Sequence, residues 1–128
     1  LNCLHHFTWT EIEKRTSQEK SIALGAWGSE WHDRISYASN FEYPPEKTPY
    51  EIPMGCLESI DTSNLFCAGR LADGDRKAGA AIRVMATSMA TGQAAGTAAA
   101  LLASARYSAA ELQSVLRADG VITKATDL

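Results

Sequence analysis

Apolar residues form short runs in the first half of this chain and one long alanine-rich stretch in the second half. Residues 21–27 and 65–68 are compact apolar runs bounded by polar or turn residues. Both predict strands, the second of them buried and ended by Gly69. Residues 50–53 predict a short edge strand. Three of the four prolines fall within residues 40–49, where the loss of amide donors predicts an extended surface crossing.

Two short helices are predicted from capping boxes, in which a hydroxyl residue is followed three positions later by Glu. The first box, at residues 8–11, predicts the start of a polar helix over residues 10–19. The second box, at residues 108–111, opens a final helix. Gly120 is placed to end that final helix as a carboxyl-terminal cap.

The alanine-rich stretch predicts one long helix over residues 82–104, about 30 Å long at ~1.5 Å per residue. Its three- and four-residue spacing predicts one inward face, made of Met85, Met89, Gly92, Gly96, Ala99 and Ala103. The glycine pair would let another element approach closely. Polar residues, among them Arg83, Thr87 and Gln93, interrupt the helix, so we expect it to pack in a globular protein and not in a membrane.

Composition narrows the class of protein and of partner. The chain has 128 residues, of which 45% are hydrophobic and 21% charged, and this balance predicts one folded globular segment. The formal net charge is −3 and the basic residues form no stripe, which argues against a nucleic-acid partner.

The cysteines argue against both a metal site and a disulfide framework. Cys3, Cys56 and Cys67 are three in number and widely spaced, with no Cys-x-x-Cys pair. A reducing compartment such as the cytoplasm is therefore expected, with Cys67 as a buried structural thiol. The chain opens at Leu1 without a signal-peptide pattern, and we expect a native beginning upstream of it.

The order of the parts around Gly69 predicts a binding site. A short strand ends at this glycine, a loop containing Gly74 and Gly79 follows, and a long helix begins near Arg83. Such a layout directs backbone amides and the positive end of a helix dipole towards one place. These residues alone predict a site for an anion or a cofactor, and they also allow a purely structural helix.

Three segments in this order resemble the closing part of the FAD-dependent oxidoreductase family, flavoproteins with a glutathione-reductase-like two-domain fold. They are Asn-Leu-Phe-Cys-Ala-Gly-Arg at residues 64–70, Ile-Arg-Val-Met at residues 82–85 and Gly-Gln-Ala-Ala-Gly at residues 92–96. The resemblance covers roughly residues 8–103. In that family the FAD-binding fold is split, and its first half carries a Gly-x-Gly-x-x-Gly turn that this sequence lacks.

The resemblance implies an α/β fold, the carboxyl-terminal fragment of a split FAD-binding fold with few strands, one long alanine-rich helix and a terminal helix. Residues 1–60 would be the end of a substrate domain, and residues 61–128 the carboxyl-terminal part of the FAD-binding domain. The implied activity is hydride transfer between an unidentified small organic substrate and FAD, with the isolated chain inactive. The alternative is a cofactor-free interaction or structural fragment that self-associates as a homo-oligomer.

The resemblance also implies which residues bind FAD. Gly69 and Arg70 would lie beside the ribityl chain and the flavin. The helix start would direct its amides at the pyrimidine end of the isoalloxazine, and the residues implied there are Ala81, Ile82, Arg83 and Val84. Where the family commonly has Ser and further polar residues, this chain has two carboxylates, Asp73 and Asp75. Such charges are unfavourable near an anionic cofactor unless they are solvated or paired, and we expect a solvated loop.

Other candidates have structural alternatives. Arg70 and Arg83 could contact FAD or form surface ion pairs. His32 could donate a proton to a substrate, although a structural histidine is the preferred interpretation. Trp27 and Trp31 could shield a flavin face or simply pack in the core. No catalytic acid or base can be named.

Overall fold

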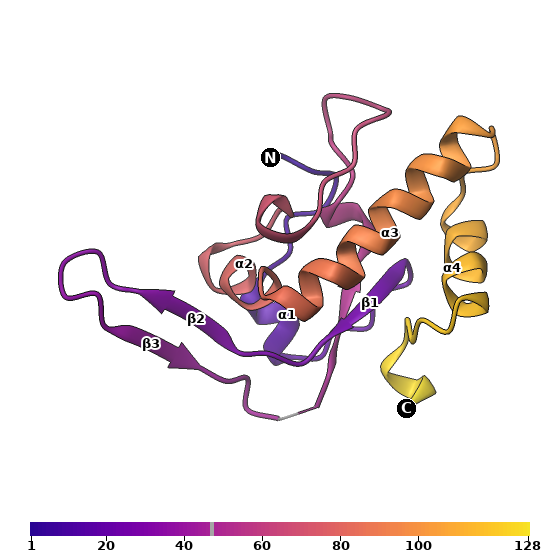
Figure 1. Cartoon of the computed structure of the whole chain (residues 1–128). Coiled ribbons are helices and arrows are strands. Elements are labelled where there is room, and N and C mark those ends of the chain that lie inside the picture. The colour runs from indigo at the N-terminus through magenta and orange to yellow at the C-terminus, as the bar shows by residue number, and fades with distance from the viewer. Residues whose placement is uncertain (47) are drawn as a thin grey trace.

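A computed structural model describes residues 1–46 and 48–128 as a mixed α/β fold, as predicted (Figure 1). The strands are β1 (Ser21–Gly25), β2 (Ser29–His32), β3 (Ser39–Glu42) and β4 (Tyr50–Pro53). The α-helices are α1 (Trp9–Glu13), α2 (Arg76–Ile82), α3 (Met85–Ala103) and α4 (Ala109–Ala118). Three 3₁₀ turns, η1 to η3, cover Met54–Cys56, Gly69–Leu71 and Ala125–Asp127.

The central sheet consists of β1 and β4, which run antiparallel with Gly25 opposite Tyr50 and Ser21 opposite Pro53. Both strands were predicted, although β1 ends at Gly25 instead of residue 27. All four residues of β4 are buried, and α3 and α4 pack against its partner strand β1. The largest fully buried side chains come from these strands, the amino-terminal segment and the helices, and they are Tyr50, Phe7, Ile12, Ile22, Ile52, Met54, Leu57, Ile82, Leu112 and Leu116.

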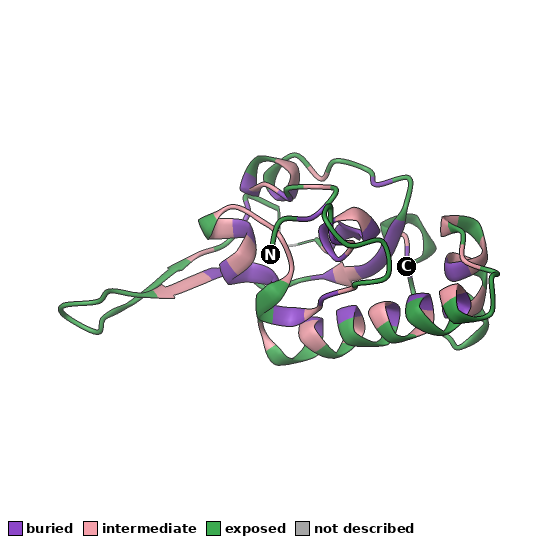
Figure 2. Cartoon of the chain, turned by 90° about the horizontal axis from the view of Figure 1, so that it is seen from above, coloured by how far each residue is buried: buried purple, intermediate pink, exposed green. Residues whose placement is uncertain are grey.

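The second sheet is a hairpin of β2 and β3 that projects from the body as an arm (Figures 1 and 2). The predicted extended surface crossing over residues 40–49 agrees with residues 40–42, which are extended and mostly exposed, but their pairing with β2 as part of β3 was not predicted. All residues of β3 are exposed or only half-buried, so its sequence lacks the apolar alternation that reveals a strand. At the base of the arm, the rings of Trp27 and Phe41 pack edge-on, with their centroids 5.4 Å apart.

The predicted capping box at Thr8 is complete, the one at Ser108 shows its first bond, and α1 is shorter than expected. The amide of Glu11 donates to Thr8 Oγ1 at 3.3 Å, and the amide of Thr8 donates to the Glu11 carboxylate at 2.8 Å, which completes the capping box. The helix ends at Glu13 and not at residue 19, because Arg15 adopts a left-handed backbone with φ of 50°. Ser108 accepts from the Glu111 amide at the start of α4.

The predicted buried strand over residues 65–68 is wrong. This segment forms only an isolated bridge between Phe66 and Glu58, and Leu65 is 42% exposed. Two backbone hydrogen bonds join it to the preceding segment, from the Cys67 amide to Leu57 and from the Ser59 amide to Leu65. With one neighbour and so few bonds, the apolar run is extended but does not become a regular strand.

The long helix is confirmed over Met85–Ala103, but its predicted start and inward face are wrong. The chain forms α2 up to Ile82, then breaks at Arg83 and at Val84, whose backbone is extended. Met85 and Met89 are 78% and 70% exposed. The buried residues are instead Thr87, Thr91, Ala94, Ala98 and Leu101. Among residues 1–46 and 48–128, no helix combines the length and apolar character needed to cross a membrane.

Candidate functional site

Gly69 lies against the first turns of α3 at the start of the short turn η2 (Gly69–Leu71). Its φ is +57°, a backbone conformation that side chains disfavour. A Cβ at this position would lie 2.9 Å from Ser88 Oγ. Its amide donates to Thr91 Oγ1 at 3.1 Å. The close approach of η2 to α3 therefore requires glycine at this position.

The amino-terminus of α3 has the character of an anion site. Its cap residue Val84 has a hydrophobic side chain that makes no capping hydrogen bond. The first backbone bond recorded for this turn runs from the Ser88 amide to Val84, which leaves the amides of residues 85–87 at the open end of a 19-residue helix. Aligned peptide dipoles give such an end a partial positive charge.

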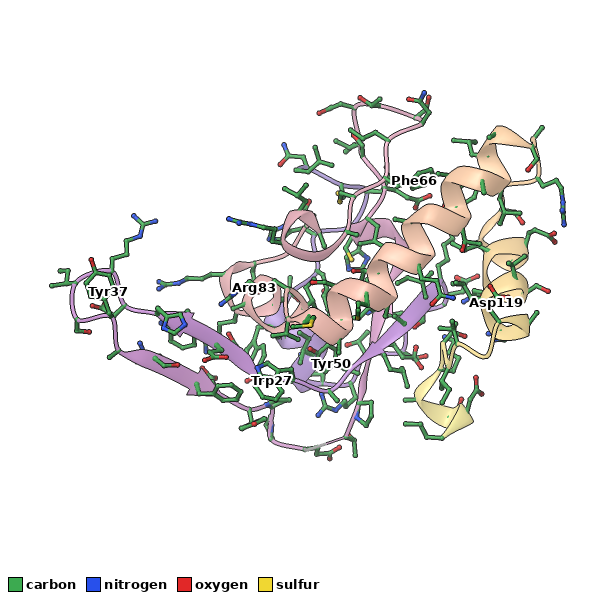
Figure 3. All side chains as sticks on the ribbon, in the orientation of Figure 1. Trp27, Tyr37, Tyr50, Phe66, Arg83 and Asp119 are labelled. Carbon is green, nitrogen blue, oxygen red and sulfur yellow. The ribbon has the colours of Figure 1, made fainter. Side chains whose placement is uncertain are left out.

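Two exposed arginines belong to the segments next to α3, the turn η2 and the joint between α2 and α3. Arg70 follows Gly69 in η2 and is exposed. Arg83 occupies the joint between α2 and α3, where Figure 3 labels it, and is also exposed. Its guanidinium donates to the carbonyl of Glu30 in β2 at 2.8 Å, which ties the projecting arm to the joint. Arg83 therefore has a structural contact, and each arginine retains donors for an anionic ligand.

Ala81 and Ile82 lie elsewhere than the sequence predicts. Both belong to the last turn of α2 and are buried in the core, because the helix start falls at residue 85. Of the predicted residues, Arg83 and Val84 directly precede α3, Gly69 packs against Ser88 and Thr91 of α3, and Arg70 is the exposed residue after Gly69. The sequence analysis missed the amides of residues 85–87. The signal that could have revealed them is Asp75: as a capping residue it indicates a separate helix from residue 76, so the long helix has to begin later.

The two carboxylates of the loop have structural partners, so the predicted solvated loop is wrong. Asp75 caps α2 by accepting from the amides of Lys77 and Ala78, and it also accepts from the amide of Trp9. Asp73 accepts from the Cys3 amide at 2.8 Å and from the His6 ring at 2.7 Å. Burial alone would raise the pKa of Asp73, but these donors hold the pKa below its usual value.

The projecting arm holds the remaining candidates. Trp31, His32 and Arg76, together with residues 33–35 of the turn that joins β2 to β3, line a cavity of about 530 Å³. The Arg76 guanidinium lies 5.7 Å from the centre of the Trp31 ring, a cation–π arrangement. Trp27 packs edge-on against Phe41. Both tryptophans thus have packing partners, and a role for them or for His32 beside a flavin or substrate stays a prediction. Within the described parts of the chain, no three His, Cys, Asp or Glu side chains are grouped to hold a metal ion.

The fold and site define an α/β chain with a glycine-dependent turn packed against an open helix amino-terminus. A family model described as FAD dependent oxidoreductase matches residues 1–120, so the chain belongs to that family. No curated protein and no solved structure matches it. FAD is accordingly the cofactor of the family.

Proposed function

We propose that this chain is the carboxyl-terminal portion of a glutathione-reductase-like FAD-dependent oxidoreductase and supplies one part of its FAD site. The observation that carries the proposal is the uncapped start of α3 beside the Gly69 turn. Membership of the family supplies the ligand for this arrangement. Residues 61–128 would belong to the FAD-binding domain and residues 1–60 to the end of a substrate domain, although both parts share one core in this chain.

The residues of this site suit the charge of the cofactor. Bound FAD would supply the hydride chemistry, and its site would have to accommodate negative charge at the pyrimidine end of the flavin ring. Amides 85–87 at the α3 start would stabilise that negative charge. Arg70 would lie beside the ribityl chain and the flavin, and Arg83 would contact the flavin or the diphosphate as a charge-assisted donor. A reducing compartment such as the cytoplasm suits the three free thiols.

The chain lacks a Gly-x-Gly-x-x-Gly turn, and the structure gives its nearest glycines other tasks. A Cβ at Gly25 would meet the Tyr50 ring, and one at Gly28 would meet the Glu42 carbonyl at 2.5 Å. Both glycines therefore serve close packing. Without a diphosphate cradle, this chain alone should bind FAD weakly and be inactive.

The proposal is tested by titrating the 128-residue chain with FAD and recording a two-dimensional amide NMR spectrum at each step, because NMR detects weak binding. We expect saturable shift changes at residues 69–70 and 84–87. Replacing Arg70 with Gln should weaken binding about fivefold, the effect of losing ~1 kcal/mol from an exposed charge-assisted contact. The control is Arg34→Gln in the exposed arm, which should leave the affinity unchanged.

Two outcomes would contradict the proposed site. One is saturable FAD binding whose shift changes leave residues 69–70 and 84–87 untouched. The other is an equal loss of affinity in Arg70→Gln and Arg34→Gln, which would indicate non-specific attraction of the diphosphate.

The alternative function, a cofactor-free fragment that self-associates, is favoured by the exposed face of α3. Met85 and Met89 are exposed there, and nothing lies within 4 Å of a Cβ built at Gly92 or Gly96. The helix carries no charged residue to oppose association. Self-association through this face predicts a gel-filtration volume that shifts with concentration and becomes constant in Met89→Glu. A concentration-dependent shift that persists unchanged in Met89→Glu would exclude this face as the contact.

A further inference from the structure

Two of the three thiols meet in space although they are far apart in sequence. The sulfur atoms of Cys3 and Cys67 lie 3.7 Å apart, and the two residues are 64 positions apart in the chain. Both are free and mostly buried, and each is about 7% exposed. A disulfide bond is about 2.05 Å long, so closing this pair requires the sulfurs to approach by less than 2 Å.

The third thiol, Cys56, is a neighbour of this pair, since the Cys67 sulfur lies 3.8 Å from the Cys56 carbonyl oxygen, but the Cys56 thiol has a partner of its own. Cys56 is fully buried, and its S–H donates to the carbonyl of Pro53 at 3.1 Å. Cys3, in contrast, lies in an amino-terminal segment whose residues Leu1, Asn2 and Leu4 are exposed. Local opening of that segment would admit a small oxidant to Cys3 and Cys67 while Cys56 stays covered.

The surroundings of Cys3 and Cys67 should make oxidation of the two thiols slow. Burial, together with the neighbouring thiol and the Asp73 carboxylate, raises the pKa of Cys3 to about 12. Burial likewise raises the pKa of Cys67. Since the thiolate is the reactive form, the pair should resist brief oxidation and respond to a sustained oxidising thiol–disulfide couple.

We propose that Cys3 and Cys67 are a redox modification site that forms an intramolecular disulfide with glutathione disulfide, or a similar small disulfide, as oxidant. One thiolate attacks the oxidant to form a mixed disulfide and releases one glutathione. The second sulfur then displaces the other glutathione. Two protons and two electrons leave the protein, and two glutathione thiols form. The disulfide would link the amino-terminal segment to Cys67, two residues before Gly69. Oxidation would therefore restrict the motion of the chain that leads into η2.

The test is oxidation of the full chain by glutathione disulfide under native conditions, followed by non-reducing peptide mapping and thermal unfolding. The expected result is a mass loss of two hydrogen atoms, a crosslinked peptide containing Cys3 and Cys67, and reversal by dithiothreitol. Closing a loop of this length should raise the midpoint temperature by on the order of 10 °C, because the unfolded chain loses entropy.

Cys3→Ser and Cys67→Ser should each abolish the mass loss and the thermal shift, whereas the matched variant Cys56→Ser should retain both. Unfolding of the reduced variants shows whether each still folds, and Cys3→Ala replaces Cys3→Ser if it does not. A crosslink that contains Cys56, stable glutathione adducts on single thiols, or thiols that stay reduced at equilibrium would overturn the proposal.

Discussion

Replacing Gly25 with valine should destabilise the chain by about 3 kcal/mol, the upper part of the usual range for overpacking a core. A Cβ at this position would lie 2.3 Å from Tyr50 Cε2 and 2.5 Å from Cζ. The Tyr50 ring cannot retreat, because it is fully buried and its hydroxyl donates to the carbonyl of Trp27 at 3.0 Å. Urea unfolding followed by tryptophan fluorescence would measure the change.

The matched control is Gly96→Ala in α3. Nothing lies within 4 Å of a Cβ at Gly96, so the new methyl group meets no atom. Alanine in a helix interior is more favourable than glycine, and this variant should gain about 0.5–1 kcal/mol. Equal urea midpoints for Gly25→Val and the unmodified chain would show that Tyr50 does not pack against Gly25 as described.

Replacing Glu51 with alanine should cost about 2–3 kcal/mol, since it removes the partner of a mostly buried ion pair and of two amides. The Glu51 carboxylate accepts from the amide of Gln18 at 2.8 Å, from Lys124 Nζ at 3.1 Å and from the amide of Ala125 at 3.1 Å. It thereby fastens the carboxyl-terminal segment to β4. The expected loss of unfolding free energy is not larger because Lys124 is partly exposed and water screens its charge. Urea unfolding measures the loss, and exposed Glu19→Ala is the control.

The same carboxylate predicts a pH dependence. Burial opposes its charge, but the amides and Lys124 outweigh burial and lower the pKa of Glu51. A lowered pKa in the folded state gives stability that is complete above the unfolded value of about 4.3 and is lost as the pH falls through the folded pKa. The gap in unfolding free energy between the unmodified chain and Glu51→Gln should therefore be constant from pH 6 to 8 and shrink below about pH 4. A constant gap down to pH 2 would contradict this assignment.

Local signals in the sequence predicted the elements whose causes are local. The capping box at Thr8 and the short strand over residues 50–53 needed only their neighbours, and both are observed. The hairpin of β2 and β3 was missed because its strands are polar and its pairing joins segments that show no alternation. The inward face of α3 was wrong because almost every residue of that helix is small or apolar. Spacing cannot choose a face when all faces are alike, and the contact with β1 makes the choice.

The candidate site was predictable in part. Gly69 could be placed beside the helix by resemblance, and its positive φ and close contact with Ser88 give a physical reason for the glycine. The break at Arg83 and Val84 was not predictable from helix propensity, which is favourable on both sides of it. Tertiary contacts decide it, among them the bond from Arg83 to the carbonyl of Glu30.

Asp75 links two parts of the chain that are 66 residues apart. One of its carboxylate oxygens receives the amides at the start of α2, and the other receives the amide of Trp9 at the start of α1. Its own amide donates to the carbonyl of Phe7. Detaching the amino-terminal segment therefore breaks two of these bonds and weakens the anchoring of the α2 cap. We therefore expect the first and second helices to lose their order together when the chain opens locally.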